Sequence, residues 1–157
     1  MEFHIRKAQP SDVAEIIRLC AEHSEYEKAS YSSEGKAEKL ASFLFNVHPH
    51  IFCILAESGK DVLGFATYMF EFSTWDAAFY THMDCLYLRP HARGLGIGEK
   101  LIKEIAKAAK ENDCKQIQWQ TPVFNERAIK FYHRIGAASK EKLRLYIDET
   151  TINKLIL

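Results

Sequence analysis

The chain has 157 residues, with 21 basic and 21 acidic side chains and therefore no formal net charge. This length suits a single domain, 1–157, built around one core. The balanced charge offers no broad attraction for nucleic acid or anionic lipid, so we expect neither a nucleic-acid nor a membrane partner. No apolar run approaches the roughly 20 residues of a bilayer span. The start, MEFHIRK, is unlike a secretory signal, which predicts a cytoplasmic protein.

The cysteines give no sign of a metal site. Cys20, Cys53, Cys85 and Cys114 lie far apart in the sequence, and none belongs to a Cys-x-x-Cys pair. Structural zinc sites use such pairs, or histidines at regular spacing. We therefore expect reduced, mostly buried thiols and no metal.

The first half of the chain mixes strand and helix patterns. In chain order, the predicted elements are a strand over 3–8, a helix over 10–23, a helix over 33–45, and strands over 51–57 and 62–72. Asp12 with Glu15 predicts a capping box at the start of the first helix. The turn signal SGKD joins the last two strands into a hairpin.

The second half continues with a strand over 78–88, a helix over 99–112, a strand over 116–121, a helix over 125–137 and a last strand over 141–147. Pro90 closes the first of these strands, since proline has no amide hydrogen to donate. Gly136 is placed to cap the helix over 125–137. The order of elements predicts an α/β fold with a mixed central sheet, antiparallel N-terminal strands and about four flanking helices.

Three alternate glycines, Gly94, Gly96 and Gly98, precede the helix over 99–112. The segment is not a P-loop, because Glu99 and Lys100 stand where that motif has Lys and Ser or Thr. It is not a dinucleotide fingerprint either, because Glu99 replaces the last glycine. Both motifs share a physical role, in which small residues let backbone amides approach a phosphate at a helix N-terminus. We expect this role here; a glycine-rich turn without a ligand is the alternative.

These residues carry a family resemblance. The segment LYLRPHARGLGIG, 86–98, resembles the acetyl-CoA motif of the GNAT family of N-acetyltransferases, whose pattern [RQ]-x-x-G-x-[GA] is met by Arg93, Gly96 and Gly98. The segment NERAIKFYHRIGA, 125–137, is similar to the next motif of that family. The resemblance implies acetyl-CoA as co-substrate. The implied coenzyme contacts are Leu86, Tyr87, Leu88, Arg93, Gly94, Leu95, Gly96, Ile97, Gly98, Glu99, Asn125 and Ala128.

Within this family the chain is most similar to the diamine and polyamine branch, which includes the spermidine/spermine and thialysine acetyltransferases. The supporting segments are EYEK, HPHIFCILAE and GFATYMFEFSTW. This resemblance implies a small primary amine as acceptor, with Tyr26, Glu27, Asp84 and Trp75 as its contacts. Relatives in the branch are often dimeric, so a homodimer is the protein partner that the resemblance suggests. Solvent-exposed helix charge and an apolar surface are the alternatives for Glu27 and Trp75.

Acetyl transfer to an alkylamine needs the amine in its neutral form, although its pKa is near 10.4. The resemblance implies Asp84 as the proton acceptor and Tyr132 as the acid that protonates the departing thiolate. The chain departs from the branch at this point, because Asp84 and Cys85 stand where the relatives have Glu and Asp. Proton removal through an ordered water is therefore expected. A carboxylate that only binds the ammonium is the alternative for Asp84.

The resemblance further implies a β-bulge in the strand over 78–88 and a backbone amide, that of Leu86, directed at the thioester carbonyl. An acyl-enzyme on Cys85 is disfavoured for two reasons: the Asp84 carboxylate should raise the pKa of the thiol, and strand alternation should turn the two side chains to opposite faces.

Two alternative functions stay open. An aminoglycoside, an amino acid or a protein amine could replace the small amine as acceptor, because related enzymes differ most in the acceptor pocket. A non-catalytic acyl-CoA-binding module would need the glycine loop but neither a base nor an acid.

Overall fold

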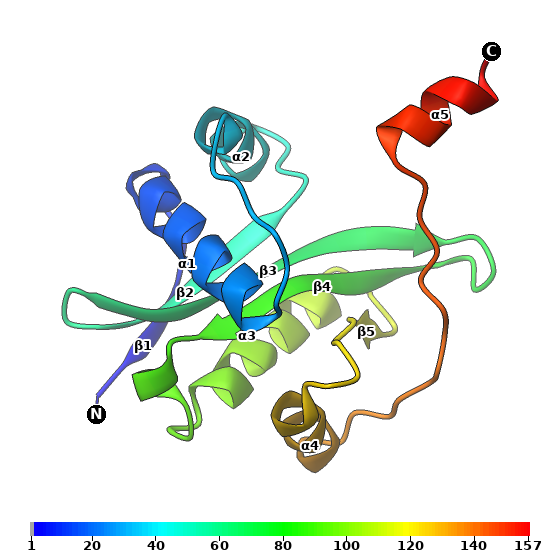
Figure 1. Cartoon of the computed structure of the whole chain (residues 1–157). Helices are drawn as coiled ribbons and strands as arrows, with labels where there is room; N and C mark the ends of the chain where they lie inside the picture. The colour runs from blue at the N-terminus through cyan, green and yellow to red at the C-terminus, as the bar shows by residue number, and fades with distance from the viewer. Residues whose placement is uncertain (1) are drawn as a thin grey trace. The chain divides into compact units, whose positions relative to one another are not determined.

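The computed structural model describes residues 2–157 and divides the chain into two units, one up to Asn125 and one from Glu126 to Leu157. The first unit contains a five-stranded sheet in the order β1-β2-β3-β4-β5 (Figure 1). Its strands are β1 (His4–Lys7), β2 (Phe52–Ser58), β3 (Asp61–Ser73), β4 (Ala78–Leu88) and β5 (Ile117–Gln118). The first four are antiparallel and β5 runs parallel to β4, which confirms the predicted mixed sheet.

Three α-helices of this unit pack on the sheet. They are α1 (Val13–Tyr26), α2 (Lys36–Leu44) and α3 (Ile97–Glu111), with two short 3₁₀ turns, η1 (Pro10–Asp12) and η2 (Pro90–Ala92). The helices α1 and α2 bury one face, where Ile16 and Leu19 meet Leu55 and Phe65. On the other face α3 contributes its fully buried stripe of Ile97, Leu101 and Ile105. Each such side chain contributes about 1.5–3 kcal/mol by leaving water.

Gly64 sets how closely β3 and β4 approach. A Cβ at this position would lie 2.3 Å from the Tyr87 carbonyl oxygen and 2.6 Å from the Leu88 side chain. An isolated glycine inside an apolar strand is the sequence signal for such a close approach. The backbone of Tyr87 and Leu88 is therefore held against β3 at a distance that no other residue at position 64 permits.

The second unit consists of α4 (Glu126–Arg134), an irregular segment, and α5 (Glu149–Leu155). Gly136 has a φ of 96° just after α4, as expected for its capping role. Asp148 caps α5 by accepting the Thr151 amide at 2.8 Å.

Two of the predicted strands differ in the structure, and one helix is added to the about four that were expected. Residues 141–147 form no strand, because a strand needs a hydrogen-bonded neighbour and the structure places none beside this segment, in which Leu143 and Leu145 stay exposed. The strand over 116–121 shortens to β5, which pairs only with Thr81 and His82. The described residues also contain five α-helices rather than about four, the additional one being α5.

The predicted capping box was wrong as well. The Asp12 carboxylate accepts the Gln9 amide at 2.7 Å and both ends of the Arg6 guanidinium, at 2.7 and 2.9 Å, instead of capping α1. Arginine, with its planar fork of donors, competes for carboxylates more strongly than a helix amide does. Along residues 2–157, no helix combines the length and the apolar content that crossing a membrane requires.

Candidate active site

The glycine loop ends in an open helix N-terminus. Gly94 and Gly96 have φ angles of 83° and 78°, which L-residues with side chains rarely adopt. Gly96 is the N-cap of α3, and no side chain caps the helix. A Cβ on either glycine would meet no atom within 4 Å, so the space in front of the loop is open. The first amides of α3, from Ile97 and Gly98, have no acceptor within their own helix, which suits an incoming phosphate.

A β-bulge at Asp84 changes the direction of β4. In the ladder with β3, Met83 pairs with Tyr68 and Cys85 pairs with Thr67, so Asp84 has no partner across the ladder. The backbone amide of Cys85 donates to the hydroxyl of Thr67 at 3.1 Å, on the β3 side. The amide of Thr81, an even number of residues earlier, points to the opposite side, toward Gln116. The extra residue therefore reverses the alternation of the strand, as expected for a bulge.

Beyond the bulge, alternate backbone groups of β4 face an unpaired edge. Since the Cys85 amide points toward β3, the N–H and C=O groups of Leu86 and Leu88 point away from it. Within the described part of the chain, no strand pairs with that edge after His82. The Leu88 carbonyl accepts the Arg93 Nε at 2.9 Å. The Leu86 amide is thus turned toward an edge with which no strand of the described residues pairs.

Arg93 connects the glycine loop to the end of α1. Its guanidinium carbon lies 4.5 Å from the ring centre of Tyr26 and 5.7 Å from that of Tyr87. The Tyr26 hydroxyl donates to the Asn125 Oδ1 at 2.9 Å, and His23 stacks on Tyr87 with ring centres 5.4 Å apart. Four of the predicted site residues (Tyr26, Tyr87, Arg93 and Asn125) therefore form one contiguous cluster.

Asp84 and Cys85 both face α1. Asp84 is exposed, and its Oδ2 lies 3.9 Å from the Cys85 Sγ. The expectation that alternation separates these two side chains was wrong, because the bulge places consecutive residues on the same face. The expected effect on the thiol is confirmed: burial, and then the Asp84 carboxylate, raise the pKa of Cys85 to about 12. A thiol with this pKa is a poor nucleophile near neutral pH.

Acidic groups surround this position. Glu27, just past α1, also raises the pKa of Cys85, although less than burial and Asp84 do. Its carboxylate lies 3.2 Å from the His23 Nε2. The Cys20 thiol of α1 has a pKa raised to about 11, by burial first and by Asp84 next. Two carboxylates, Asp84 and Glu27, therefore act on the same small region, which favours a cationic ligand.

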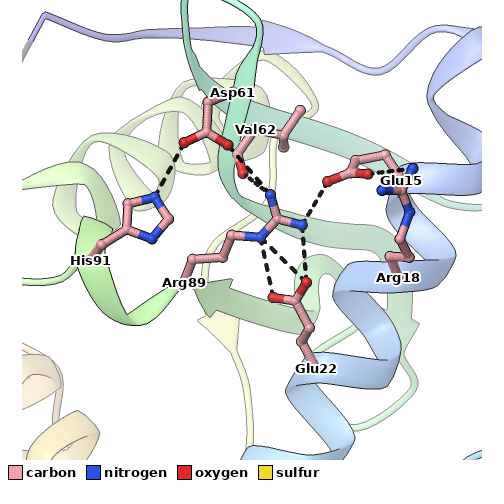
Figure 2. Close-up of polar contacts among 7 residues, drawn as sticks. All are labelled: Glu15, Arg18, Glu22, Asp61, Val62, Arg89 and His91. Atoms are coloured by element: carbon pink, nitrogen blue, oxygen red, sulfur yellow. Dashed lines mark hydrogen bonds and ion pairs between the residues drawn. The ribbon is translucent and has the colours of Figure 1, made fainter.

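Arg89 joins α1 to the start of β3. Its guanidinium bonds to Glu15 at 2.7 Å and to Glu22 at 2.9 Å on α1, and to the Val62 carbonyl at 2.8 Å on β3 (Figure 2). These contacts raise the pKa of Arg89 above its ordinary value, the Glu22 hydrogen bond having the largest effect. Arg89 directly precedes η2 and the glycine loop. It therefore fixes α1, β3 and the start of the loop to one another.

Trp75, Ala128 and Tyr132 are also predicted site residues. Trp75, in the connection between β3 and β4, is 95% exposed. It lies nine residues before Asp84, six of them in the extended β4, so roughly 20 Å of strand separate the two residues and the structure does not bring them together. Ala128 and Tyr132 are half-buried on α4, in the second unit. Their roles stay predictions.

Sequence reasoning missed three contributors: Arg89, Thr67 and Gly64. The isolated Gly64 gave a usable signal, whereas Arg89 and Thr67 are ordinary residues whose partners lie far away in the chain. No group of three or more His, Cys, Asp or Glu side chains suited to a metal ion occurs within residues 2–157. The four cysteines are free thiols, and Cys53 is the one that is buried.

The part of the chain that contains the glycine loop and β4 also matches the model of a known family. The model of the acetyltransferase (GNAT) family matches residues 13–137. The chain is 34% identical over 141 residues to the thialysine N-epsilon-acetyltransferase of Bos taurus, covering 85% of this chain and 82% of the relative. It is 30% identical to a human spermidine/spermine N(1)-acetyltransferase-like protein 1, over 86% of this chain but 20% of that longer protein.

A solved structure is also similar over nearly the whole length. It is an integron cassette protein from the mobile metagenome of V. cholerae, with a TM-score of 0.82 and 28% identity, and the match covers 99% of this chain and 98% of the other. The order of strands and helices found here is therefore shared with a protein whose structure was determined independently.

Proposed function

Because the chain belongs to the acetyltransferase (GNAT) family and is an acetyl-CoA-dependent N-acetyltransferase, we propose that its acceptor is a small primary amine with a second positive charge, such as a diamine or a lysine-like amine. The observation that carries this proposal is that two carboxylates, Asp84 and Glu27, both act on the Cys85 thiol beside the bulge of β4. The names of the relatives, which include thialysine as a substrate, support the same class of amine.

In this proposal the glycine loop holds the diphosphate of the co-substrate. The amides of Gly94 to Glu99 supply donors at the N-terminus of α3, and Arg93 adds positive charge. The edge of β4 at Leu86 to Leu88 lies beside the pantetheine arm, and the Leu86 amide donates to the thioester carbonyl oxygen. Asn125 and Ala128 complete the contacts, as the family resemblance implies.

Asp84 accepts the proton of the bound ammonium through a water molecule. Its exposure leaves room for that water, and within residues 2–157 no arginine or lysine forms an ion pair with its carboxylate. The neutral amine nitrogen then attacks the thioester carbonyl carbon and the carbon–sulfur bond breaks. Tyr132, whose phenol is protonated near neutral pH, gives its proton to the leaving thiolate.

Release of CoA thiol across a panel of amines tests the proposal. The panel contains a diamine, a lysine analogue, an aminoglycoside, an amino acid and a peptide. We expect the diamine and the lysine analogue to give the highest kcat/KM. If acetyl-CoA binds but no amine in the panel causes release of the CoA thiol, the result would instead support a non-catalytic acyl-CoA-binding module.

Two variants test the assigned roles. Asp84→Asn should lower kcat by about 10²-fold or more, whereas Asp76→Asn, at an exposed aspartate of the β3–β4 connection, should not. Tyr132→Phe should lower turnover far more than coenzyme affinity. Unchanged turnover in either site variant would remove that residue from the mechanism.

A homodimer, a cytoplasmic location and the lack of a nucleic-acid partner complete the proposal. The homodimer is supported by the exposed apolar side chains of the second unit, which include Leu143, Leu145, Tyr146, Leu155 and Ile156. Light scattering during gel filtration should give twice the mass of the 18.1 kDa chain, and a monomer would contradict this part.

A further inference from the structure

The segment between α1 and α2 presents one aromatic ring to the protein. Among residues 28–36 every side chain is exposed except that of Tyr31, which is half-buried. The Lys36 ammonium lies 3.7 Å from the centre of the Tyr31 ring. This distance is well inside the roughly 6 Å limit of a cation–π contact. The ring therefore has a primary ammonium on one face, and the protein supplies that ammonium itself.

The Tyr31 ring belongs to the region of Asp84. Burial, followed by the thiols of Cys20 and Cys85, raises the pKa of the Tyr31 phenol. Cys85 lies 3.9 Å from the Asp84 carboxylate. Lys36 and Asp84 act on the Cys20 thiol with opposite signs, since the ammonium lowers its pKa and the carboxylate raises it. The ammonium, the ring and the carboxylate thus each interact electrostatically with the Cys20 thiol of α1.

Packing of α2 supports this arrangement. Leu40 lies one turn after Lys36, so the two residues share a face of α2. Leu40 packs against the same apolar cluster as Cys20 and Cys85. Lys36 therefore lies on the side of α2 that packs against this apolar cluster, and its exposed position leaves it free to move away.

We propose that the face of the Tyr31 ring is a subsite for the second, non-reacting ammonium of the acceptor, which displaces the Lys36 ammonium when it binds. This inference rests on the proposed function and extends it to a residue that decides between diamines and monoamines. The bound ammonium gains the ring on one side and the charges of Asp84 and Glu27 nearby. Lys36 shows that a primary ammonium on a flexible chain fits this place, and its own contact is an exposed one that costs little to break.

Calorimetry with two matched ligands tests the subsite. The ligand 1,3-diaminopropane carries the second ammonium, and propylamine has the same carbon skeleton without it. Lys36→Met removes the internal competitor and should tighten binding of the diamine about two- to fivefold, the value of one exposed cation–π contact. Propylamine should bind this variant as it binds the wild type. Lys39→Met, an exposed lysine on the same helix, is the control and should change neither affinity.

The ring is tested with a second pair of variants. Tyr31→Leu should weaken binding of the diamine to a similar extent, whereas Tyr31→Phe should keep it, since the ring and not the hydroxyl makes the contact. Equal diamine affinity in Lys36→Met and Lys39→Met, or wild-type affinity in Tyr31→Leu, would overturn the subsite, as would the lack of any diamine binding. The test is independent of turnover: diamine binding that responds to Lys36 without CoA release would preserve the subsite and refute the proposed catalysis.

Discussion

Replacing Arg89 with methionine removes the guanidinium that holds α1 against β3 and the start of the glycine loop (Figure 2). The side chains involved are mostly shielded, since Arg89 is 18%, Glu15 17% and Glu22 35% exposed. Each hydrogen bond to a charged group is worth about 1.5–3 kcal/mol, but these bonds share one cation and are partly screened. Removal of Arg89 also leaves the Glu22 carboxylate without its cation, whereas Glu15 keeps Arg18. We therefore expect the free energy of unfolding to fall by about 2–3 kcal/mol.

Urea denaturation at pH 7 measures this loss, and for a chain of this size the melting temperature should fall by about 4–10 °C. Arg18→Met is the matched control, because Arg18 bonds the same Glu15 carboxylate at 2.9 Å but is 69% exposed. It should cost no more than about 0.5 kcal/mol. If the two variants lost the same free energy of unfolding to within about 0.5 kcal/mol, the argument that Arg89 is the cation that fixes α1 would be refuted.

Three further predictions follow from particular contacts. Gly64→Ala should lower the free energy of unfolding, measured by urea denaturation, by about 3 kcal/mol, because the new Cβ would lie 2.3 Å from the Tyr87 carbonyl oxygen. A variant as stable as the wild type would show that β3 and β4 can move apart at little cost. The hydrogen bond from Arg6 holds the pKa of Asp12 below its ordinary value of 3.8. Asp12 therefore stabilises the fold above pH 3.8, and this stabilisation is lost as the pH falls through the lower pKa that Asp12 has in the folded state. The Asp12→Asn variant should therefore be less stable than the wild type at pH 7 and should lose less stability on acidification. Urea midpoints that fall by the same amount in both proteins from pH 7 to pH 3 would contradict the ion pair. Cys85→Ala should keep CoA release within about twofold, because a thiol with a pKa of about 12 is not the nucleophile; a loss above 100-fold would restore an acyl-cysteine route.

The sequence predicted the parts that depend on local pattern. The strand over 78–88 coincides with β4, because its alternating apolar run ends at a proline that cannot continue a ladder. The glycine loop was located and given a physical role, because positive φ angles and a helix start leave a clear mark in a sequence. The hairpin of β2 and β3 was found from its turn residues.

What the sequence missed depends on partners distant in the chain. The family resemblance implied a bulge in the strand over 78–88, but its position at Asp84, where the Cys85 amide donates to Thr67, was not predicted, and alternation alone gave the wrong face for Cys85. The strand expected over 141–147 had the right pattern but no neighbour to pair with. Asp12 was predicted to begin a capping box with Glu15, whereas it completes one that Gln9 begins, and Arg6 binds it from another element. In each case a long-range contact overrode a correct local preference.

Backbone amide shifts in a nuclear magnetic resonance titration with CoA test the central claim, that the glycine loop and the open edge of β4 hold the co-substrate. The account predicts that the largest shifts fall on the amides of Gly94 to Gly98 and on Leu86, while amides of β1 on the far side of the sheet stay unchanged. Shifts concentrated in another region, with the amides of Gly94 to Gly98 unmoved at saturating CoA, would contradict it.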